Sequence, residues 1–233
     1  MVFKTEIIEI IQRTPNVKSF RFSRPKPFEY KAGQYLIIVL ADPKGNIMKN
    51  PLTISSSPTE DFLEVTKKIT AGHEFSEAIS SLTVGDELQL DGPFGQFILD
   101  PTQNKIAMLS GGIGITPFRS MCRYSTDSKL KTDIFLCYGN KTSEDIVFKQ
   151  EFDQMKKQNP HFNIVHTLSR QDSNWKGHTG RIDTNMIQQE IPDYTQRLFY
   201  LCGPPGMVKA MENLLDELGI AKKQIVVEKF GTN

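Results

Sequence analysis

Short runs of alternating apolar and polar residues fill the chain up to about residue 100. This period of two is typical of strands with one buried face, and Gly, Pro, Asn or Asp residues separate the runs. A single helix-like segment, SEAISSL (76–82), interrupts them. The pattern predicts a six-stranded antiparallel Greek-key β-barrel over residues 1–100. The six runs are TEIIEIIQR (5–13), VKSFRFSR (17–24), QYLIIVL (34–40), PLTISSS (51–57), FLEVTKKI (62–69) and DELQLDG (86–92).

The rhythm changes from Lys105 onward, where apolar strand-length runs alternate with segments of helical period. Such alternation predicts a parallel doubly wound sheet, and we assign this five-stranded α/β domain to residues 101–233. The spacing of Thr142 and Asp145 predicts a cap for a long helix within 143–159. The expected strands are KIAMLSG (105–111), DIFLCYG (133–139), FNIVHTLSR (162–170), RLFYLCG (197–203) and IVVEKF (225–230).

Composition and charge narrow the possible functions. A formal net charge of +1 argues against a nucleic-acid-binding protein, because no excess of basic residues is present. No apolar run approaches bilayer length, and the charged N-terminal stretch predicts a strand rather than a signal peptide, so we expect a cytoplasmic protein. Cys122, Cys137 and Cys202 are too few and too far apart for an iron–sulfur or zinc site, and we expect no metal.

The segment LSGGIGITPFRS (109–120) joins the first parallel strand to a helix. Gly111, Gly112 and Gly114 allow a sharp turn and a close approach of a phosphate group to the backbone. Thr116 is predicted to be the N-cap and Pro117 the first helical residue, which would leave free N–H groups for an anion. Any tight strand-to-helix turn also favours glycine, so the loop alone leaves both interpretations open.

Polar, small and aromatic residues follow the other strands of this half. The carboxyl ends of parallel strands share one edge of the sheet, where open α/β sheets bind ligands. We therefore expect a ligand site formed by Gly111–Gly112, Tyr138–Asn140, Ser169–Arg170, Cys202–Pro204 and Glu228–Phe230.

Five motifs along the chain together resemble the ferredoxin–NADP⁺ reductase family: GPFGQF (92–97), SGGIGITPFRS (110–120), YGNKT (138–142), CGPPGM (202–207) and VEKFG (227–231). This superfamily pairs a flavin-binding barrel with a nicotinamide-binding α/β domain. The resemblance implies an NAD(P)H-dependent flavoprotein reductase, which moves hydride between nicotinamide and flavin N5. Electrons would then pass to a separate carrier such as ferredoxin or flavodoxin, or to a diffusible acceptor.

By this resemblance, the stretch from Asn50 through Pro51, Leu52 and Thr53 to Ser56 matches the flavin-binding motif of the barrel. Thr53 corresponds to the hydroxyl that faces flavin N5, and Ser56 to the second serine. Asn50 and Leu52 depart from the usual arginine and tyrosine, as in the His-Pro-Phe-Thr variant of the ferric reductase branch. Asn50 lacks the charge and Leu52 the aromatic ring, so Lys49 or Lys67 is expected to compensate. FAD is favoured over FMN.

Two further barrel segments match the family. Gly72 and Ser76 stand where it places the FAD pyrophosphate, although an ordinary N-cap serine would look the same. Gly92 belongs to a glycine-rich turn that the family holds close to the cofactor.

In the second half, the resemblance places Cys202, with Gly203 and Pro204, beside the nicotinamide, and the loop from Gly111 to Pro117 at its pyrophosphate. A buried cysteine can also be simply a small apolar residue. The pair Glu228 and Phe230 resembles a terminal pair near the open face of the flavin, and the alternative for Phe230 is closure of the core.

Ser169 and Arg170 resemble a pair that binds the 2′-phosphate, which favours NADP(H) over NAD(H), although a lone arginine is often only solvated. Arg119 is interpreted as a helix-packing or domain-interface residue rather than a ligand.

Three other functions remain open at this point. The departures at Asn50 and Leu52 also suit an NAD(P)H:flavin reductase that releases flavin as a product. A non-catalytic electron-transfer subunit of a larger oxidoreductase would keep the same fold. A nucleotide-binding module without flavin would carry only the second set of motifs.

Overall fold

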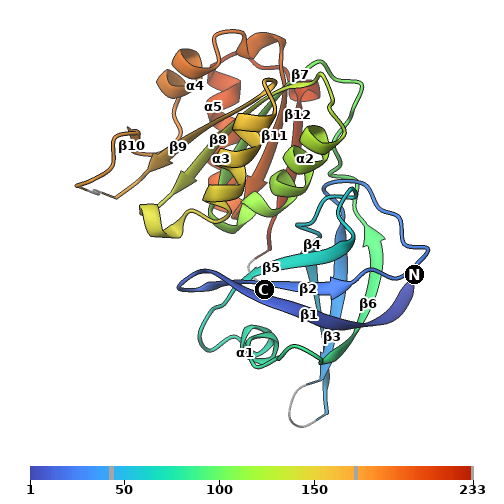
Figure 1. The fold of residues 1–233 in the computed structure, drawn as a ribbon. Helices are drawn as coiled ribbons and strands as arrows, with labels where there is room; N and C mark the ends of the chain where they lie inside the picture. Colours follow the sequence, from blue (N-terminus) through green and yellow to red (C-terminus); the bar gives the residue numbers. More distant parts are fainter. Residues whose placement is uncertain (42–44, 171–172, 232–233) are drawn as a thin grey trace.

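Two sheets form the molecule, one antiparallel and one parallel (Figure 1). The computed structural model describes residues 1–41, 45–170 and 173–231. Each sheet has its own apolar core, and a short connection over residues 95–104 joins them. The predicted boundary between residues 100 and 101 lies in this connection, and we keep it as the proposed division.

The antiparallel sheet has the strand order β4-β3-β6-β1-β2-β5. An antiparallel bridge between Ile54 and Val65 brings its two edges together, so that the sheet curls into a barrel. Alternate residues such as Phe20, Phe22 and Leu36 fill the interior, as the period of two predicts. The strands are β1 (Val2–Thr14), β2 (Val17–Ser23), β3 (Tyr35–Ala41), β4 (Ile47–Thr53), β5 (Phe62–Lys68) and β6 (Glu87–Phe94), and helix α1 (Glu74–Ser80) packs onto them.

The parallel sheet has the order β10-β9-β8-β7-β11-β12 and contains the five expected strands. Beside them lies one that the pattern did not predict, the two-residue β10 (His178–Thr179), whose length is too short for a periodic signal. The five are β7 (Lys105–Gly111), β8 (Asp133–Asn140), β9 (Phe162–Leu168), β11 (Leu198–Gly203) and β12 (Ile225–Lys229).

Helices cover both faces of the parallel sheet (Figure 1). Helices α2 (Thr116–Asp127) and α3 (Lys149–Gln158) pack on one face, and α4 (Thr184–Glu190) and α5 (Pro205–Glu217) on the other. Within β7, Ile106 and Met108 face the first pair and Ala107 and Leu109 the second. Burial on both faces explains why these strands are almost continuously apolar. No described helix is long and apolar enough to span a membrane.

Two predicted helix starts were wrong. Gly112–Ile115 form a 3₁₀ turn, and α2 continues directly from it, so Thr116 is the first residue of α2 rather than its N-cap and Pro117 is the second. Pro117 has no N–H for the carbonyl of Ile113, four residues earlier, and the hydroxyl of Thr116 donates to that oxygen instead, at 3.3 Å.

The second error concerns Thr142. It forms a capping box with Asp145, as the spacing indicates, but the box caps a 3₁₀ turn over Ser143–Asp145. Helix α3 begins only at Lys149, after Phe148 takes a left-handed conformation with φ 61°. One predicted long helix is therefore two shorter segments.

Candidate functional site

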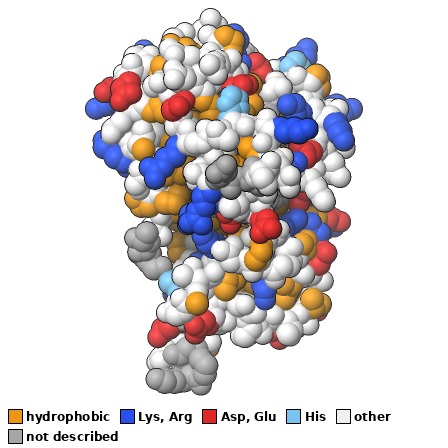
Figure 2. Space-filling view, turned by 90° about the vertical axis from the view of Figure 1, so that its left-hand side faces the viewer, with side chains coloured by type: hydrophobic (Ala, Val, Ile, Leu, Met, Phe, Trp, Pro, Cys, Tyr) orange, Lys and Arg blue, Asp and Glu red, His pale blue; other side chains and the backbone are white. Residues whose placement is uncertain are grey.

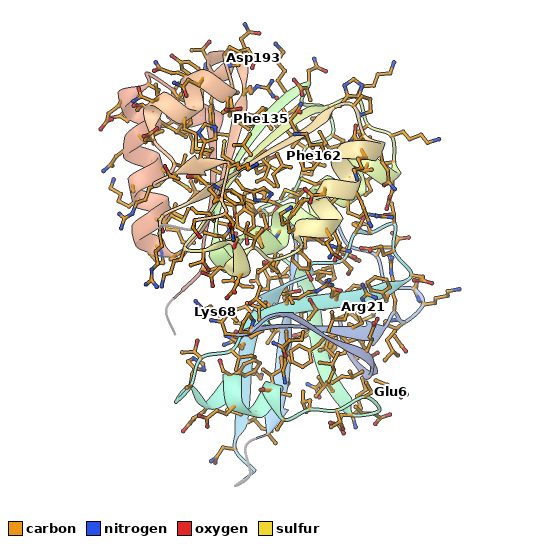
Figure 3. All side chains as sticks on the ribbon, turned by 60° about the vertical axis from the view of Figure 1, so that its left-hand side comes forward. Glu6, Arg21, Lys68, Phe135, Phe162 and Asp193 are labelled. Carbon is orange, nitrogen blue, oxygen red and sulfur yellow. The ribbon has the colours of Figure 1, made fainter. Side chains whose placement is uncertain are left out.

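A cavity of about 310 Å³ lies between the barrel and the carboxyl edge of the parallel sheet. Both domains contribute its walls, as the fold class predicts for a site shared between them. Figure 2 shows Lys and Arg side chains at the waist between the two halves of the molecule, and Figure 3 shows Lys68 on the side of the barrel that faces the α/β domain. The lining residues are Gly33, Tyr35, Asn50, Pro51, Leu52, Thr53, Thr66, Lys67, Lys68, Gly95, Ile113, Thr116, Glu228, Lys229, Phe230 and Gly231.

Thr53 ends strand β4 on the barrel wall of the cavity. Its backbone pairs with Tyr35 of β3, whose ring lies 5.8 Å from that of Phe94 between centroids. Thr53 is 9% exposed, and within the described residues its hydroxyl has no hydrogen-bond partner. A nearly buried hydroxyl at a cavity wall can donate to or accept from a bound group.

Lys67 lies on the neighbouring strand β5 and is half-buried in the same wall. Burial lowers the pKa of its ammonium group. It makes no ion pair within the part of the chain that the structure describes. A partly desolvated cation without a counter-ion favours binding of an anion, because the opposite charge compensates for the hydration that the cation has lost.

Glu228 and Phe230 form the opposite wall, at the end of β12. The backbone N–H of Phe230 donates to the carbonyl of Gly203 at 3.1 Å, which holds this segment against the end of β11. Burial raises the pKa of the Glu228 carboxyl. The segment therefore adds an aromatic ring and a polar group to the cavity, opposite the Thr53 hydroxyl.

Cys202 lies immediately behind this wall rather than in it. Its backbone pairs with Glu228 and its side chain is fully buried. Burial, and after it the nearby Glu228 carboxylate, raise the pKa of the thiol well above its usual value, so that Cys202 is a neutral thiol and no nucleophile. Gly203 is also buried, while Pro204 is exposed at the start of α5.

The glycine loop reaches the cavity through Ile113 and through Thr116 at the start of α2. Gly112 has a φ of +54°, which favours glycine, and its carbonyl accepts from the Tyr138 hydroxyl at 2.9 Å. A Cβ on Gly114 would lie 2.4 Å from the Cys202 carbonyl oxygen, so only glycine lets the turn pack on β11. Gly111, buried at the end of β7, and Pro117, buried in α2, lie behind this surface.

Four residues expected at the flavin lie outside the cavity lining. Ser56 is fully buried, and its hydroxyl pairs with Tyr30 at 2.9 Å and accepts from the backbone of Glu64 at 2.9 Å. Gly72 is exposed before α1. Gly92 is buried in β6, before a cis peptide bond to Pro93. The fourth is Ser76.

Ser76 is the third residue of α1, so the N-cap interpretation was wrong. His73 is the N-cap, and its Nδ1 accepts from the backbone of Ser76 at 3.4 Å. The Ser76 hydroxyl is buried and has no hydrogen-bond partner among the described residues.

Ser169 and Arg170 are exposed at the end of β9, away from the cavity lining. Their backbone N–H groups donate to Asn140 at 2.9 Å and Lys141 at 3.0 Å, so the two strand ends lie together as the topology predicts. Both side chains are accessible at the nucleotide-binding edge expected for a doubly wound sheet.

Several lining residues were missed from the sequence. Tyr35, Thr66 and Lys68 enter the site because β3 and β5 flank the end of β4. Lys229 was expected, because it lies within the strand end Glu228–Phe230. The hairpin from QYLIIVL to PLTISSS would have placed Tyr35 only once the strand register was known. The remaining missed residues are Gly33 and Gly231, whereas Gly95 belongs to the glycine-rich turn GPFGQF (92–97), and Ile113 to the loop 111–117, which were both expected near a cofactor.

The composition of the cavity suits a planar cofactor and a phosphate-bearing ligand. Tyr35 and Phe230 offer aromatic rings, Thr53 and Thr66 hydroxyl groups, and the lysines positive charge. No group of three or more His, Cys, Asp or Glu side chains that could hold a metal ion occurs within residues 1–41, 45–170 and 173–231.

Comparison with known proteins agrees with the two-domain organisation. Residues 4–98 match the family Oxidoreductase FAD-binding domain, and residues 108–213 match Oxidoreductase NAD-binding domain. The chain is 32% identical over 232 residues to the glycine betaine monooxygenase reductase subunit of Chromohalobacter salexigens, covering 96% of this chain and 63% of that protein. It is 30% identical over 220 residues to NADH-cytochrome b5 reductase 1 of Dictyostelium discoideum, covering 90% of this chain and 76% of that protein.

A solved structure confirms the fold. A ferredoxin NADP⁺ reductase from Neisseria gonorrhoeae, crystallised with FAD and NADP, superposes with a TM-score of 0.84 at 22% identity and covers 98% of each chain. The family resemblance inferred from the five motifs and the expected fold class are both confirmed. The chain belongs to the ferredoxin–NADP⁺ reductase-like family of FAD- and nicotinamide-binding oxidoreductases.

Proposed function

We propose that this reductase binds FAD and a nicotinamide nucleotide on the two walls of the interdomain cavity and passes electrons to a separate acceptor. The observation that carries the proposal is the meeting of Thr53 and Lys67, from the barrel, with Glu228 and Phe230, from the α/β domain, around one cavity. Bound flavin would accept a hydride at N5 from the nicotinamide and release electrons onward.

The barrel wall supplies the groups that would hold the flavin. Thr53 presents a hydroxyl with no partner among the described residues, suited to a ring nitrogen. Lys67 supplies the positive charge that Asn50 lacks, and Tyr35 supplies the aromatic surface that Leu52 lacks. Two departures from the family motif are thus offset by neighbouring strands. Ser76 would contribute its buried hydroxyl to the pyrophosphate, together with the backbone near Gly72.

The α/β wall would hold the nicotinamide. Glu228 and Phe230 line the cavity directly, and Cys202 with Gly203 forms the layer behind them, where a neutral thiol excludes water without reacting. The loop from Gly111 to Thr116 would receive the pyrophosphate, with N–H groups of the 3₁₀ turn as donors. Arg170 and Ser169 would contact the 2′-phosphate, which favours NADP(H) over NAD(H).

The acceptor is proposed to be a separate electron-carrier protein such as ferredoxin or flavodoxin, or a diffusible acceptor. Two relatives are named for reduction of other proteins, a monooxygenase and cytochrome b5, which supports transfer to a protein partner. The second candidate is a flavin reductase. Asn50 and Leu52 favour it, because flavin that is held through the neighbouring Lys67 and Tyr35 instead of the motif itself would be released more readily.

An anaerobic absorption spectrum tests the proposal. The purified protein, loaded with FAD, should bleach on addition of NADPH and more slowly with NADH. FAD that stays with the protein through gel filtration supports a bound cofactor, and FAD that elutes separately supports the flavin reductase. A loaded protein that neither nucleotide bleaches would contradict both.

A further inference from the structure

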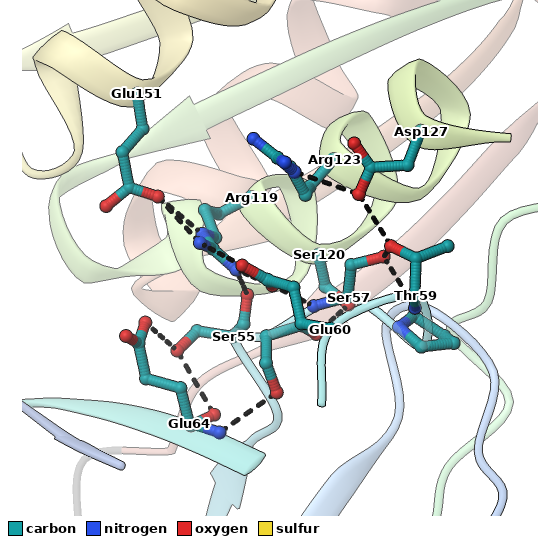
Figure 4. Close-up of polar contacts among 12 residues, drawn as sticks. Ser55, Ser57, Thr59, Glu60, Glu64, Arg119, Ser120, Arg123, Asp127 and Glu151 are labelled. Carbon is teal, nitrogen blue, oxygen red and sulfur yellow. Dashed lines mark hydrogen bonds and ion pairs between the residues drawn. The ribbon is translucent and has the colours of Figure 1, made fainter. Parts of the chain in front are cut away.

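Arg119 is a buried cation on α2, only 2% exposed. Its guanidinium donates to three groups: to the Ser55 carbonyl at 3.0 Å, to Glu151 at 2.9 and 2.7 Å, and to both carboxylate oxygens of Glu60, one of them at 2.9 Å. Figure 4 shows these contacts converging on Arg119 from both domains. Burial acts to lower the pKa of Arg119, but its ion pairs with the glutamates outweigh burial and raise it.

The segment that Arg119 holds is the continuation of the flavin wall. Ser55 follows Thr53 by two residues, and the next carbonyl, that of Ser56, accepts from the Ser120 hydroxyl at 2.6 Å. Two successive residues of α2 therefore fix two successive carbonyls beyond Thr53. The same helix begins at Thr116, which lines the cavity from the other domain. One helix thus sets how the two walls face each other.

Arg119 also belongs to a series of alternating positive and negative side chains. The series crosses the interface between the two domains, which we call the domain join. Glu151 bridges Arg119 to Arg13, at 2.6 Å, and Arg13 reaches Glu64 at 2.9 Å. Glu64 is fully buried and also pairs with Arg21 at 2.9 Å. The ring faces of Phe148 approach both Arg13 and Arg119, with centroid distances of 4.8 and 5.7 Å.

Buried ion pairs of this kind add little net stability, because desolvation offsets most of the attraction. They nevertheless impose one geometry, since each guanidinium satisfies several fixed acceptors at once. Burial acts to raise the pKa of the Glu151 carboxyl, but the charges of Arg119 and Arg13 outweigh burial and lower this pKa. The carboxyl is therefore kept charged. A network that is costly to bury and tightly directed is suited to orienting the two domains.

We propose that Arg119 is a positioning residue, which with Glu60 sets the orientation of the flavin wall against the nicotinamide wall and thereby the rate of hydride transfer between them. The inference rests on the proposed function. Hydride transfer is sensitive to small displacements of the two rings, so a relaxed join would slow it without removing a group that touches either ring.

The test is anaerobic stopped-flow reduction of the FAD-loaded protein by NADPH, followed at the flavin absorbance over a range of nucleotide concentrations. Arg119→Lys keeps the charge but loses the fork that binds Glu60 through two nitrogens. We expect its limiting rate to fall about 10-fold or more. The apparent nucleotide Kd and the visible spectrum of the bound flavin should stay close to those of the unmodified protein.

Arg197→Lys is the matched control. Arg197 is an equally buried arginine of the α/β domain, and its contacts, to Asp133, Asp193 and the Ile106 carbonyl, all lie within that domain. We expect this variant to lose stability but to keep the limiting rate. Glu60→Gln and Ser120→Ala each weaken or remove single contacts of the same domain join. Both should lower the limiting rate, and they test the proposal even if Arg119→Lys fails to bind FAD.

Two outcomes would overturn the proposal. One is a set of join variants, Arg119→Lys, Glu60→Gln and Ser120→Ala, whose limiting rates equal that of the unmodified protein. The other is an Arg197→Lys rate that falls as far as theirs, which would indicate a general loss of stability. An unmodified protein that no nucleotide reduces would instead contradict the proposed function, and is distinguishable from both.

Discussion

At the residue scale, Thr53 is the side chain that we propose to contact the flavin from the barrel wall of the cavity. Thr53 is nearly buried, and its backbone is fixed by pairing with Tyr35. Its hydroxyl is therefore held at the wall at little further entropic cost. A hydrogen bond formed under such conditions contributes more than one formed by a mobile surface group.

Replacing Thr53 by Val keeps the branched shape and removes only the hydroxyl. Loss of one directed hydrogen bond, worth about 1–1.5 kcal/mol, should slow flavin reduction by roughly 10-fold. Thr53→Ser retains the hydroxyl and should stay close to the unmodified rate. Stopped-flow reduction measures both, and a Val variant as fast as the Ser variant would exclude a role for this hydroxyl.

His166, which lies outside the cavity lining, has a pKa that its surroundings change. Its ring lies between Tyr138 and Trp175, with centroids 5.8 and 6.5 Å away, and neither ring nitrogen has a hydrogen-bond partner among the described residues. Burial, with a smaller contribution from Lys149, lowers its pKa from 6.5 to about 4. Native His166 therefore stays neutral at pH values where the unfolded chain binds a proton.

The sign of the pH effect follows from this difference. The unfolded state takes up a proton below pH 6.5 and the native state only near pH 4, so stability falls as the pH falls through this window. Between these pH values, the free energy of unfolding of His166→Phe should fall by roughly 2 kcal/mol less than that of the unmodified protein. Urea unfolding at several pH values measures it, with the exposed His161→Phe as control. An unchanged pH slope in His166→Phe would contradict the prediction.

At the element scale, the period of the hydrophobic pattern predicted most of the strands and helices. The six barrel strands alternate because one face is buried, and β7 has four apolar residues in a row, Ile106 to Leu109, because both of its faces are buried. Errors arose where local backbone geometry fixes a helix boundary: α2 continues from a 3₁₀ turn at Gly112–Ile115, and Phe148 takes a left-handed conformation before α3. Such local geometry leaves no trace in the hydrophobic period.

The site divides in the same way. Thr53, Glu228 and Phe230 line the cavity because they lie at the ends of β4 and β12, where the motifs had placed them, and Lys67 lines it from β5. The burial of the Ser56 hydroxyl against Tyr30 was not predictable, since its partner lies 26 residues away. The partners of Arg119 come from two distant segments, residues 55–60 and the start of α3. The sequence therefore indicated an interface but not the residues on its other side.

The turn between β7 and α2 gives a prediction at this scale. A Cβ on Gly114 would lie 2.4 Å from the Cys202 carbonyl oxygen, so Gly114→Ala must move the 3₁₀ turn away from the end of β11, at a cost of about 1–3 kcal/mol. Gly206, in α5, has open space around it and does not have a left-handed φ. Gly206→Ala should therefore leave the free energy of unfolding unchanged or raise it by about 0.5 kcal/mol. Denaturant midpoints compare them. Equal midpoints would show that the close approach carries no strain.

At the scale of the whole molecule, the two domains share apolar contacts as well as charges. Val17 and Ala32 of the barrel belong to the same buried cluster as Phe118 and Met121 of α2. The connection supplies Phe97, whose ring lies 5.8 Å from Phe118 and 5.4 Å from Tyr200. The core of the α/β domain therefore extends onto two barrel residues, and the two domains meet at a packed interface rather than at a loose hinge.

A packed interface between the domains predicts that both domains unfold together. Trp175, the only tryptophan of the chain, reports on the α/β domain through its fluorescence, while far-UV circular dichroism reports on both. In the unmodified protein the two transitions should coincide. Phe97→Ala removes the ring by which the connection packs on Phe118 and Tyr200 of the α/β domain, at a cost of about 3–5 kcal/mol. We expect this loss to weaken the coupling between the domains and to separate the two transitions.

Phe28→Ala is the control for this prediction, because Phe28 is equally buried but packs only within the barrel core, against Phe3 and Tyr30. It should lower the midpoint by a similar amount while the two signals still coincide, since the join is intact. If the signals coincide in Phe97→Ala as well, the charged chain through Arg119 suffices to couple the domains. If they separate in Phe28→Ala too, the domains are independent, and a join that fixes the two cavity walls would lose its physical basis.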